Sequence, residues 1–346
     1  MSTAATPRVS VIIPVYNGCK YIGAAIQSVL DQTFADFELI VLDNASTDNT
    51  PAVLASFADA RLLTCRNPSN LGFAGNVELG MQMARGEYVS VLGADDLLFP
   101  AFLARTVAFL DAHPTLSLVH TDAIWIDDSS RPYGESAAGW PTVTPGPEAF
   151  VDVFRFGFSF ATVLMRGERL RRFGGMNRGW GPWGDLILFL RLCLEGDAGF
   201  LAEPLAWYRH HSENLSSQMH AGNWGGMLQV EMQALDTALA WPRSRKLARP
   251  AARRRAVLFI ARRIIRMIHL ARIEGGFGKW IAEFFRVLSA APVLCFYPST
   301  WSRFGLGLLP PPAIQALQRW RHARLADSLP APPGHWRSGL PGERLL

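Results

Sequence analysis

Short apolar runs rich in β-branched residues alternate with segments of helical periodicity four times within the first part of this chain. The first run, Val9 to Val15, breaks at Asn17-Gly18, and apolar residues recur at helical spacing over 22–30. Further strands are predicted at 38–42, 61–65 and 88–92, with helices at 48–57 and 75–85 between them. This alternation predicts a Rossmann-like α/β fold with an open, mostly parallel sheet and helices on both faces.

Beyond this alternation the pattern changes. A helix is predicted at 101–113 and a strand at 118–120, followed by a loop over 127–147 that is rich in Gly, Pro, Ser and Trp. Residues 224–329 have a helical pattern with breaks at Trp241-Pro242, Gly275-Gly276 and Pro310 to Pro312. Because 346 residues are many for one domain, we predict an α/β domain over 1–222, a basic helical region over 223–329 and a flexible tail over 330–346.

No leader or membrane-spanning segment is predicted. Residues 1–7 lack the basic start of a cleaved leader. The longest uncharged apolar stretch, 287–302, contains two prolines and is shorter than the roughly 20 residues that a spanning helix needs. The four cysteines form no CxxC pair, so neither a zinc site nor a disulfide framework is expected. Together these features predict a cytoplasmic protein.

The formal net charge of +5 hides a local asymmetry. The segment from Arg243 to Arg272 holds eleven Lys or Arg and no Asp or Glu, and Val257, Ile260 and Ile264 share one face of a predicted helix within it. Such a helix indicates peripheral contact with an anionic membrane through residues 243–272. The alternative is that its apolar stripe packs on the rest of the chain. Because the basic charge is local, no nucleic-acid partner is expected.

The pair Asp95-Asp96 follows the fourth predicted strand. As an isolated dipeptide, Asp-Asp is usually a solvated turn or a helix cap. At the carboxyl end of a parallel strand, however, adjacent carboxylates lie at the mouth of the ligand crevice and need a cation or hydrogen-bond donors beside them. Mg²⁺ and Mn²⁺ prefer carboxylate and phosphate oxygens, so the pair predicts a site for Mg²⁺ or Mn²⁺ that carries a diphosphate.

Asp43 ends the second predicted strand and precedes a polar run over 44–50. Its carboxylate could accept a hydrogen bond from a nucleobase imide, and Asn17 follows the first strand at the same edge of the sheet. The alternative is that this stretch is only a strand-to-helix turn. The position of Asp43 at the carboxyl edge favours binding.

In combination, five motifs resemble glycosyltransferase family 2. They are Val-Ser-Val-Ile-Ile-Pro-Val-Tyr-Asn-Gly at 9–18, Leu-Ile-Val-Leu-Asp-Asn-Ala-Ser-Thr-Asp at 39–48, Asn70-x-Gly72, Ala84-x-Gly86-Glu87-Tyr88 and the Asp95-Asp96 pair. The resemblance extends to residue 215 or so and implies the A-type glycosyltransferase (GT-A) fold.

The resemblance also implies roles for individual residues. The nucleotide-binding residues would be Pro14, Tyr16, Asn17, Asp43, Asn76 and Asp95. Asp43 would read the base, Asp95 would contact the ribose, and Asp96 would hold the metal on the diphosphate. The chain departs from the family at Gly93, where many relatives carry Asp, and at Val77-Glu78, where many carry Arg-Asn.

A sugar transfer by single displacement needs one general base for the acceptor hydroxyl. The family places an acidic pair shortly before a Leu-Arg-Leu helix, and here Asp185 precedes Leu190-Arg191-Leu192, with Gly184 where a Glu is common. Asp185 is therefore predicted as the base, with the alternative that it only caps the helix. The segment Tyr208-Arg209-His210-His211 resembles the family's Tyr-Arg-x-His motif, which implies that His211 approaches the metal or the diphosphate.

These implications predict an inverting, non-processive transferase that uses a metal-bound UDP- or dTDP-sugar and a lipid-linked or cell-envelope glycan acceptor, in the cytoplasm or peripherally on the inner face of the plasma membrane. One alternative is a non-catalytic nucleotide-sugar-binding scaffold, suggested by Gly184 and Val77-Glu78. A second alternative, a sugar-nucleotide nucleotidyltransferase, needs a Gly-rich basic loop after the first strand, where this chain has only Lys20 as a basic residue.

Overall fold

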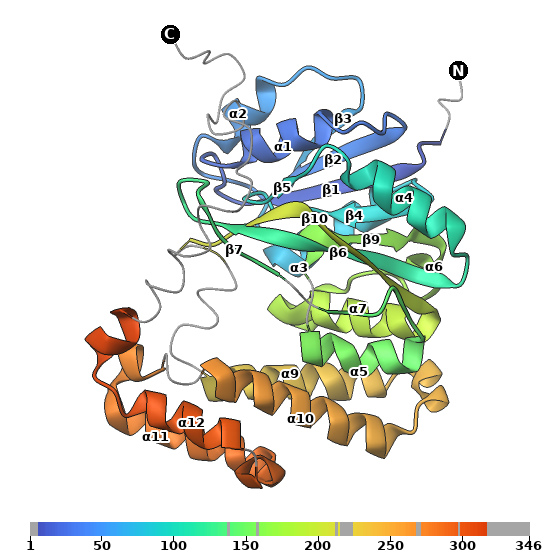
Figure 1. Ribbon diagram of the computed structural model, residues 1–346. Coiled ribbons are helices and arrows are strands. Elements are labelled where there is room, and N and C mark those ends of the chain that lie inside the picture. The colour runs from blue at the N-terminus through green and yellow to red at the C-terminus, as the bar shows by residue number, and fades with distance from the viewer. Residues whose placement is uncertain are drawn as a thin grey trace.

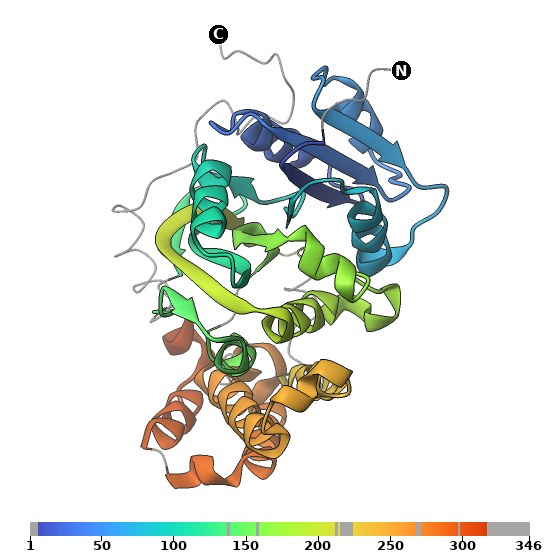
Figure 2. The same cartoon turned by 90° about the vertical axis from the view of Figure 1, so that its right-hand side faces the viewer.

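The computed structural model describes residues 6–136, 139–156, 159–211, 214, 224–267, 271–296 and 298–316. An open sheet lies at its centre in the strand order β3-β2-β1-β4-β9-β6-β10-β5, with β7 paired to β6 and β8 paired to β10 (Figure 1). Helices cover both faces of the sheet, and the C-terminal helices form a further layer on one side (Figure 2). The predicted α/β class is confirmed.

The first half of the sheet follows the predicted alternation. Its strands are β1 (Val9–Val15), β2 (Phe37–Asp43), β3 (Leu62–Arg66) and β4 (Tyr88–Val91), all parallel. The helices between and after them are α1 (Ile22–Leu30), α2 (Thr50–Ala55), α3 (Gly72–Met83) and α4 (Phe102–Ala112). Every residue of β1, β2 and β4 is buried, because helices cover both faces of these strands.

Two strands that the sequence pattern did not predict, β9 (Val163–Arg166) and β10 (Asp197–Arg209), complete the second half of the sheet. β9 lies antiparallel between β4 and β6 (Leu116–Ile126), whereas β10 is parallel to β6. The carboxyl ends of β4, β6 and β10 therefore lie at one edge. Shorter strands are β5 (Leu97–Leu98), β7 (Pro132–Glu135) and β8 (Val143–Thr144), and the last two lie in the segment expected to be a loop.

Two apolar cores lie on opposite faces of the sheet. On one face, α1, α2 and α4 contribute Ile22, Val53 and Leu103. On the other face, Val77 of α3 and Leu188 of α7 (Gly184–Glu195) pack together with α5 (Gly146–Phe156). The short elements η1 (Phe160–Thr162), α6 (Gly167–Arg172) and η2 (Arg178–Trp183) connect this face to β9.

The C-terminal region is helical, as predicted. It consists of α9 (Trp224–Leu239), η3 (Pro242–Lys246), α10 (Arg249–Met267), α11 (Ala271–Ala290), η5 (Pro292–Phe296) and α12 (Pro298–Gly307). The helical structure is interrupted after Trp241 and at Pro310. It also bends inside α11 at Gly276, whose φ of 75° favours glycine. The predicted tail over 330–346 lies outside the described residues.

The structure distinguishes between the two alternatives for the apolar stripe of α10. Ile260 and Ile264 are fully buried in the core that α10 shares with α5 and α9. The stripe therefore packs on protein, as the alternative stated, and it is not available to a membrane. The reason is that α5 and α7 leave an apolar outer surface that α9 and α10 cover. Among the helices of the described residues, none is long and apolar enough to cross a bilayer.

The same core crosses the predicted domain boundary at residue 222. Leu188 of α7 belongs to one buried cluster with Leu235 of α9, Ile260 of α10 and Trp280 of α11. Apolar packing therefore joins the helical region to the α/β part, and the division into two domains stays a prediction.

Candidate active site

The loops after β1, β2 and β4 meet at the carboxyl edge of the sheet. The register places Val15 opposite Asp43, so β1 and β2 end together, and it places Val91, the last residue of β4, opposite Ile12 of β1. Asn17, with a φ of 51°, donates its backbone N–H to Ser46 Oγ at 2.9 Å and accepts the Thr47 N–H on its Oδ1 at 2.8 Å. The predicted site residues of the first two loops are thus brought together.

Tyr16 and Pro14 lie in this first loop and strand. Tyr16 is exposed at the edge, with half of its surface open to solvent. Pro14 is buried inside β1, opposite Leu42 of β2. Of the two, only Tyr16 is open to a ligand through its side chain.

Asp43 is buried, and both of its carboxylate oxygens have partners. Oδ1 accepts the Ser46 N–H at 2.9 Å, and Oδ2 accepts from the Arg66 guanidinium at 2.8 Å. Arg66 also donates to the Ser46 carbonyl at 2.9 Å. A nucleobase that bonds to Asp43 must therefore share or displace the exposed Arg66.

Asn76 lies in the core rather than in the crevice. Its amide donates to the Leu42 carbonyl at 2.9 Å, and its Oδ1 accepts from Asn67 at 2.9 Å. Asn67 in turn bonds to Asn44 at 2.9 Å. From this buried position Asn76 supports the loop behind Asp43, and the predicted direct contact with a nucleotide is not available to it.

The carboxylates of Asp95 and Asp96 converge on the backbone of Gly93. A Cβ placed on Gly93 would lie 2.7 Å from Asp96 Oδ2 and 2.8 Å from Asp95 Oδ1. The other two oxygens are already bonded, because Asp96 Oδ1 accepts the Arg209 N–H at 2.9 Å and Asp95 Oδ2 accepts from Asn214 at 2.7 Å. One oxygen of each carboxylate is therefore left facing the space above Gly93.

Electrostatics make this pair a site for positive charge. Asp96 is buried, and this burial, together with the negative charge of Asp95, raises the pKa of the Asp96 carboxyl well above its usual value. A cation beside the two oxygens would act in the opposite direction and favour both charged forms. The pair is thus destabilised when ionised alone and stabilised by a cation.

The oxygens above Gly93 fit Mg²⁺ or Mn²⁺. The side chain that would fill this space is missing at Gly93, and two carboxylate oxygens point into it. The described residues place no third His, Cys, Asp or Glu with the pair in an arrangement that could hold a metal ion. That composition suits Mg²⁺, which is commonly held by one or two carboxylates together with substrate phosphates and water.

His211 contacts Asp95 directly. Its Nε2–H donates to Asp95 Oδ2 at 2.9 Å, which fixes the tautomer because a carboxylate can only accept. The ring also lies beside Tyr21, with centroids 5.1 Å apart. His211 is therefore next to the predicted metal site, and in this structure it orients Asp95 instead of completing a set of three ligands.

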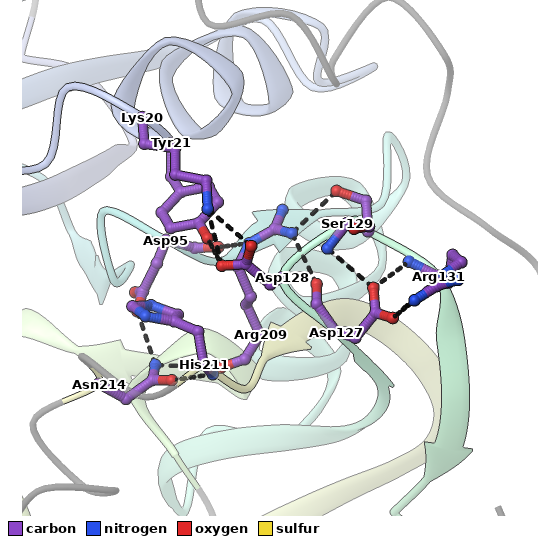
Figure 3. A network of polar contacts seen from close by, with 11 residues as sticks. Lys20, Tyr21, Asp95, Asp127, Asp128, Ser129, Arg131, Arg209, His211 and Asn214 are labelled. Atoms are coloured by element: carbon purple, nitrogen blue, oxygen red, sulfur yellow. Dashed lines mark hydrogen bonds and ion pairs between the residues drawn. The ribbon is translucent and has the colours of Figure 1, made fainter.

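Arg209 is a functional candidate that the sequence reasoning missed. Its buried guanidinium donates to the Asp95 carbonyl at 2.8 Å and to the Asp127 carbonyl at 3.0 Å, and it lies 4.6 Å from the centre of the Tyr21 ring (Figure 3). Its backbone N–H also donates to Asp96 Oδ1. Arg209 therefore joins the loop after β4 to the turn after β6 and to Tyr21 at the start of α1. The only signal in the sequence was its place in the motif that includes His211.

A small cavity of about 100 Å³ lies beside this network, lined by Lys20, Tyr21, Asp128 and Arg209 among others. Ligand pockets are typically about 300–1,000 Å³, so this cavity is too small for a nucleotide sugar. Lys20 and Tyr21 both bond to Asp128, so three of the residues that line the cavity are joined to one another (Figure 3).

Asp185 lies in the first turn of α7, on the sheet face that carries α3. Its Oδ1 accepts the Leu186 N–H at 2.7 Å. Burial raises the pKa of its carboxyl to about 6, and the charge of Glu231 on α9 acts in the same direction. A carboxylate with a raised pKa is a stronger base, which suits proton abstraction near neutral pH. Within the described residues it forms no hydrogen bond with Asp95 or Asp96.

The helix that begins beside Asp185, α7, carries Arg191, whose guanidinium lies between two tryptophan rings in an aromatic sandwich. The Arg191 guanidinium lies 4.5 Å from the Trp180 ring and 4.4 Å from the Trp241 ring. Arg178 of η2 pairs with Glu78 of α3 at 2.9 Å. These contacts connect the segment before Asp185 both to α3 and, through Arg191, to Trp241 between α9 and η3.

Comparisons with known proteins agree with this geometry. The family model described as "Glycosyl transferase family 2" matches residues 10–172 of this chain. The putative glycosyltransferase EpsE of Bacillus subtilis is 31% identical over 214 residues, which cover 60% of this chain and 74% of EpsE. Other glycosyltransferases are matched over a third to two thirds of their own length.

Two solved structures share the fold. S. aureus TarS 1–349 in complex with UDP-GlcNAc superposes with a TM-score of 0.60 at 18% identity, covering 90% of this chain and 92% of that one. The mannosyltransferase PcManGT from Pyrobaculum calidifontis, in complex with GDP-Man and Mn²⁺, gives 0.51 at 20% identity, covering 94% and 89%. The carboxylates at the sheet edge, the fold and the EpsE match lead to one conclusion: the chain belongs to glycosyltransferase family 2 and is a glycosyltransferase.

Proposed function

We propose that the carboxyl edge of the sheet binds a nucleoside diphosphate sugar and that the chain transfers this sugar, with inversion, to a glycan acceptor. The observation that carries the proposal is the convergence of Asp95 Oδ1 and Asp96 Oδ2 on Gly93, beside the loops after β1 and β2. Two carboxylate oxygens that lie close to the same glycine suit a divalent cation on a diphosphate.

In this proposal Asp96 and Asp95 would hold Mg²⁺ or Mn²⁺, and the ion would stabilise the charge that develops on the leaving diphosphate. His211 and Asn214 keep Asp95 in place through its Oδ2, and Arg209 keeps Asp96 in place through its Oδ1. A direct contact between His211 and the diphosphate stays a prediction. PcManGT, which was solved with GDP-Man and Mn²⁺, supports the use of a divalent ion.

The nucleoside is assigned to the loops after β1 and β2. Tyr16 offers an exposed ring to the base, and Asn17 and Asp43 hold the two loops against each other through Ser46. We assign the donor as a UDP- or dTDP-sugar, and the UDP-GlcNAc complex of TarS supports a uridine nucleotide. A contact of Asp95 with the ribose stays a prediction, since its Oδ1 is assigned here to the cation.

Asp185 is proposed as the general base. Its carboxylate takes the proton from the acceptor hydroxyl while that oxygen attacks the anomeric carbon and the bond to the diphosphate breaks. A single displacement of this kind inverts the anomeric configuration. The raised pKa, about 6, leaves Asp185 mostly ionised at pH 7 and makes it a stronger base than an ordinary carboxylate.

The acceptor is proposed to be a lipid-linked or cell-envelope glycan, handled in the cytoplasm at the inner face of the plasma membrane. The concentration of basic residues in 243–272 supports a location beside anionic lipid.

The test is a donor panel. Wild-type protein is incubated with UDP-, dTDP- and GDP-sugars, with Mn²⁺ or with EDTA, and released nucleoside diphosphate is measured. We expect one base to be preferred, release to require the metal, and Asp185→Asn to lose release while nucleotide binding persists. Absence of turnover with every donor, despite metal-dependent binding, would favour the scaffold alternative.

A further inference from the structure

Exposed apolar side chains are concentrated at the outer end of the C-terminal region. Ten large apolar residues are exposed among the described residues, and six of them form what we name the C-terminal apolar patch: Phe277, Phe285, Phe296, Trp301, Leu308 and Leu309. The patch lies on α11, η5, α12 and the turn that follows, in the layer farthest from the sheet (Figures 1 and 2). No part of the proposed transfer reaction uses it.

The patch rests on a continuous aromatic base. Phe304 lies between its members, with ring centroids 6.5 Å from Phe285, 6.0 Å from Trp301 and 5.0 Å from the buried Trp280. The Trp301 indole N–H donates to the Cys295 carbonyl at 2.8 Å, which places the neighbouring Phe296 beside it. Phe296 is 85% exposed and Phe285 is 53% exposed. Contiguous apolar patches of this kind mark interaction surfaces.

The chain segment that carries the patch is rich in basic residues. Residues 237–316 contain fourteen Lys or Arg and only two Asp or Glu, whereas residues 1–236 contain fifteen and 25. One of those two acids, Glu283, is buried and paired with Arg286 at 2.8 Å. Lys279 is exposed on the same helix. The net charge of residues 237–316 is therefore positive, whereas that of residues 1–236 is negative, and a positive segment favours an anionic partner.

We propose that the C-terminal apolar patch docks on an anionic phospholipid bilayer, with its aromatic side chains in the interface and the exposed Lys279 and Arg286 of α11 near the headgroups. Aromatic residues favour this zone, and basic residues near an anionic leaflet add attraction. The indole N–H of Trp301 already has a partner, so moving Trp301 out of water leaves no unpaired donor. The surface is distinct from the buried stripe of α10.

The experiment is sedimentation of the full chain with vesicles of phosphatidylcholine alone or of phosphatidylcholine and phosphatidylglycerol at 3:1. We expect cosedimentation with the anionic vesicles only. Phe296→Ser should weaken the binding about tenfold, and Phe285→Ser/Phe296→Ser about a hundredfold. The matched control is Leu63→Ser, which removes a 46% exposed apolar residue from β3 and should leave binding unchanged.

The charge contribution is tested with Lys279→Glu on α11, which should weaken binding at low salt and less so at high salt. Binding is read without any turnover, so failure here is separate from failure of the transferase proposal. Equal binding by the Phe296 and Leu63 variants would overturn the proposal. So would absence of vesicle binding together with a dimer, seen by light scattering, that Phe296→Ser dissociates, because the occupant would then be a second copy.

Discussion

Replacing Asp185 with asparagine separates two consequences of burying its carboxyl group. Burial raises the pKa of Asp185 from 3.8 to about 6, so the folded state binds this proton more tightly than the unfolded state does. The free energy of unfolding therefore falls as the pH rises from below 3.8 through 6. The loss is at most about 3 kcal/mol, and partial access to water reduces it. The asparagine side chain of the variant carries no charge, so the variant escapes this loss.

The activity of the wild type should change with pH in the opposite direction: it should rise over the pH range in which the free energy of unfolding falls. A general base must be unprotonated, so wild-type kcat/KM is expected to fall about tenfold per pH unit below pH 6, whereas an ordinary carboxylate would remain active to about pH 4. Asp185→Asn should lose about 10²–10⁴-fold in kcat at every pH. The assays are release of nucleoside diphosphate between pH 4.5 and 8, and urea unfolding at pH 4.5 and pH 8.

Asp152→Asn is the matched control. Asp152 lies on α5, and burial also raises the pKa of its carboxyl, yet it is outside the site. This variant should keep the acid limb of the wild-type profile. The reasoning fails if wild-type activity is flat down to pH 4.5, if Asp185→Asn retains turnover, or if Asp185→Asn is less stable than the wild type at pH 8.

Three further predictions concern neighbouring parts of the structure. Gly93→Ala should raise the Mn²⁺ concentration needed for half-maximal nucleotide release, since its Cβ would lie within 2.8 Å of both carboxylates; an unchanged value contradicts the metal site. Trp280→Ala should cost about 3–5 kcal/mol in urea unfolding and leave a single transition, because the core is shared; two separate transitions contradict this. Arg191→Met should lower the free energy of unfolding by about 1–2 kcal/mol, because the guanidinium between the Trp180 and Trp241 rings is lost; an unchanged melting temperature in calorimetry contradicts this.

The first half of the fold could be predicted because its pattern is local. β1, β2 and β4 are apolar along their whole length, and the polar loops behind them contain Asn17, Asp43 and the Asp95-Asp96 pair. β9 and β10 escaped prediction for a physical reason. β9 is only four residues long, and β10 is interrupted by irregular pairing with β6 around Pro204, so neither shows a regular apolar period.

Side-chain partners could not be predicted in the same way. Nothing in the sequence indicates that Arg66 forms an ion pair with Asp43. Nor does the sequence indicate that the Asn76 side chain is buried and bonds to Leu42 and Asn67. Contacts of this kind join residues far apart in the chain, as Arg209 does with Asp96, 113 positions away. The resemblance to the family indicated which residues matter, and the structure adds which of them hold the others.

The most direct test of the central claim is thermal stabilisation by UDP, dTDP and GDP with and without Mn²⁺, on the wild type, Asp96→Asn and Asp36→Asn. Asp36 is a carboxylate at the opposite end of β2 and serves as the control. At a hundredfold excess over Kd, a bound nucleotide stabilises the fold by about 3 kcal/mol. We predict stabilisation by one nucleotide that requires Mn²⁺, persists in Asp36→Asn and is lost in Asp96→Asn. Stabilisation that is independent of Mn²⁺, or equal in all three proteins, would contradict a metal–diphosphate site at Asp95 and Asp96.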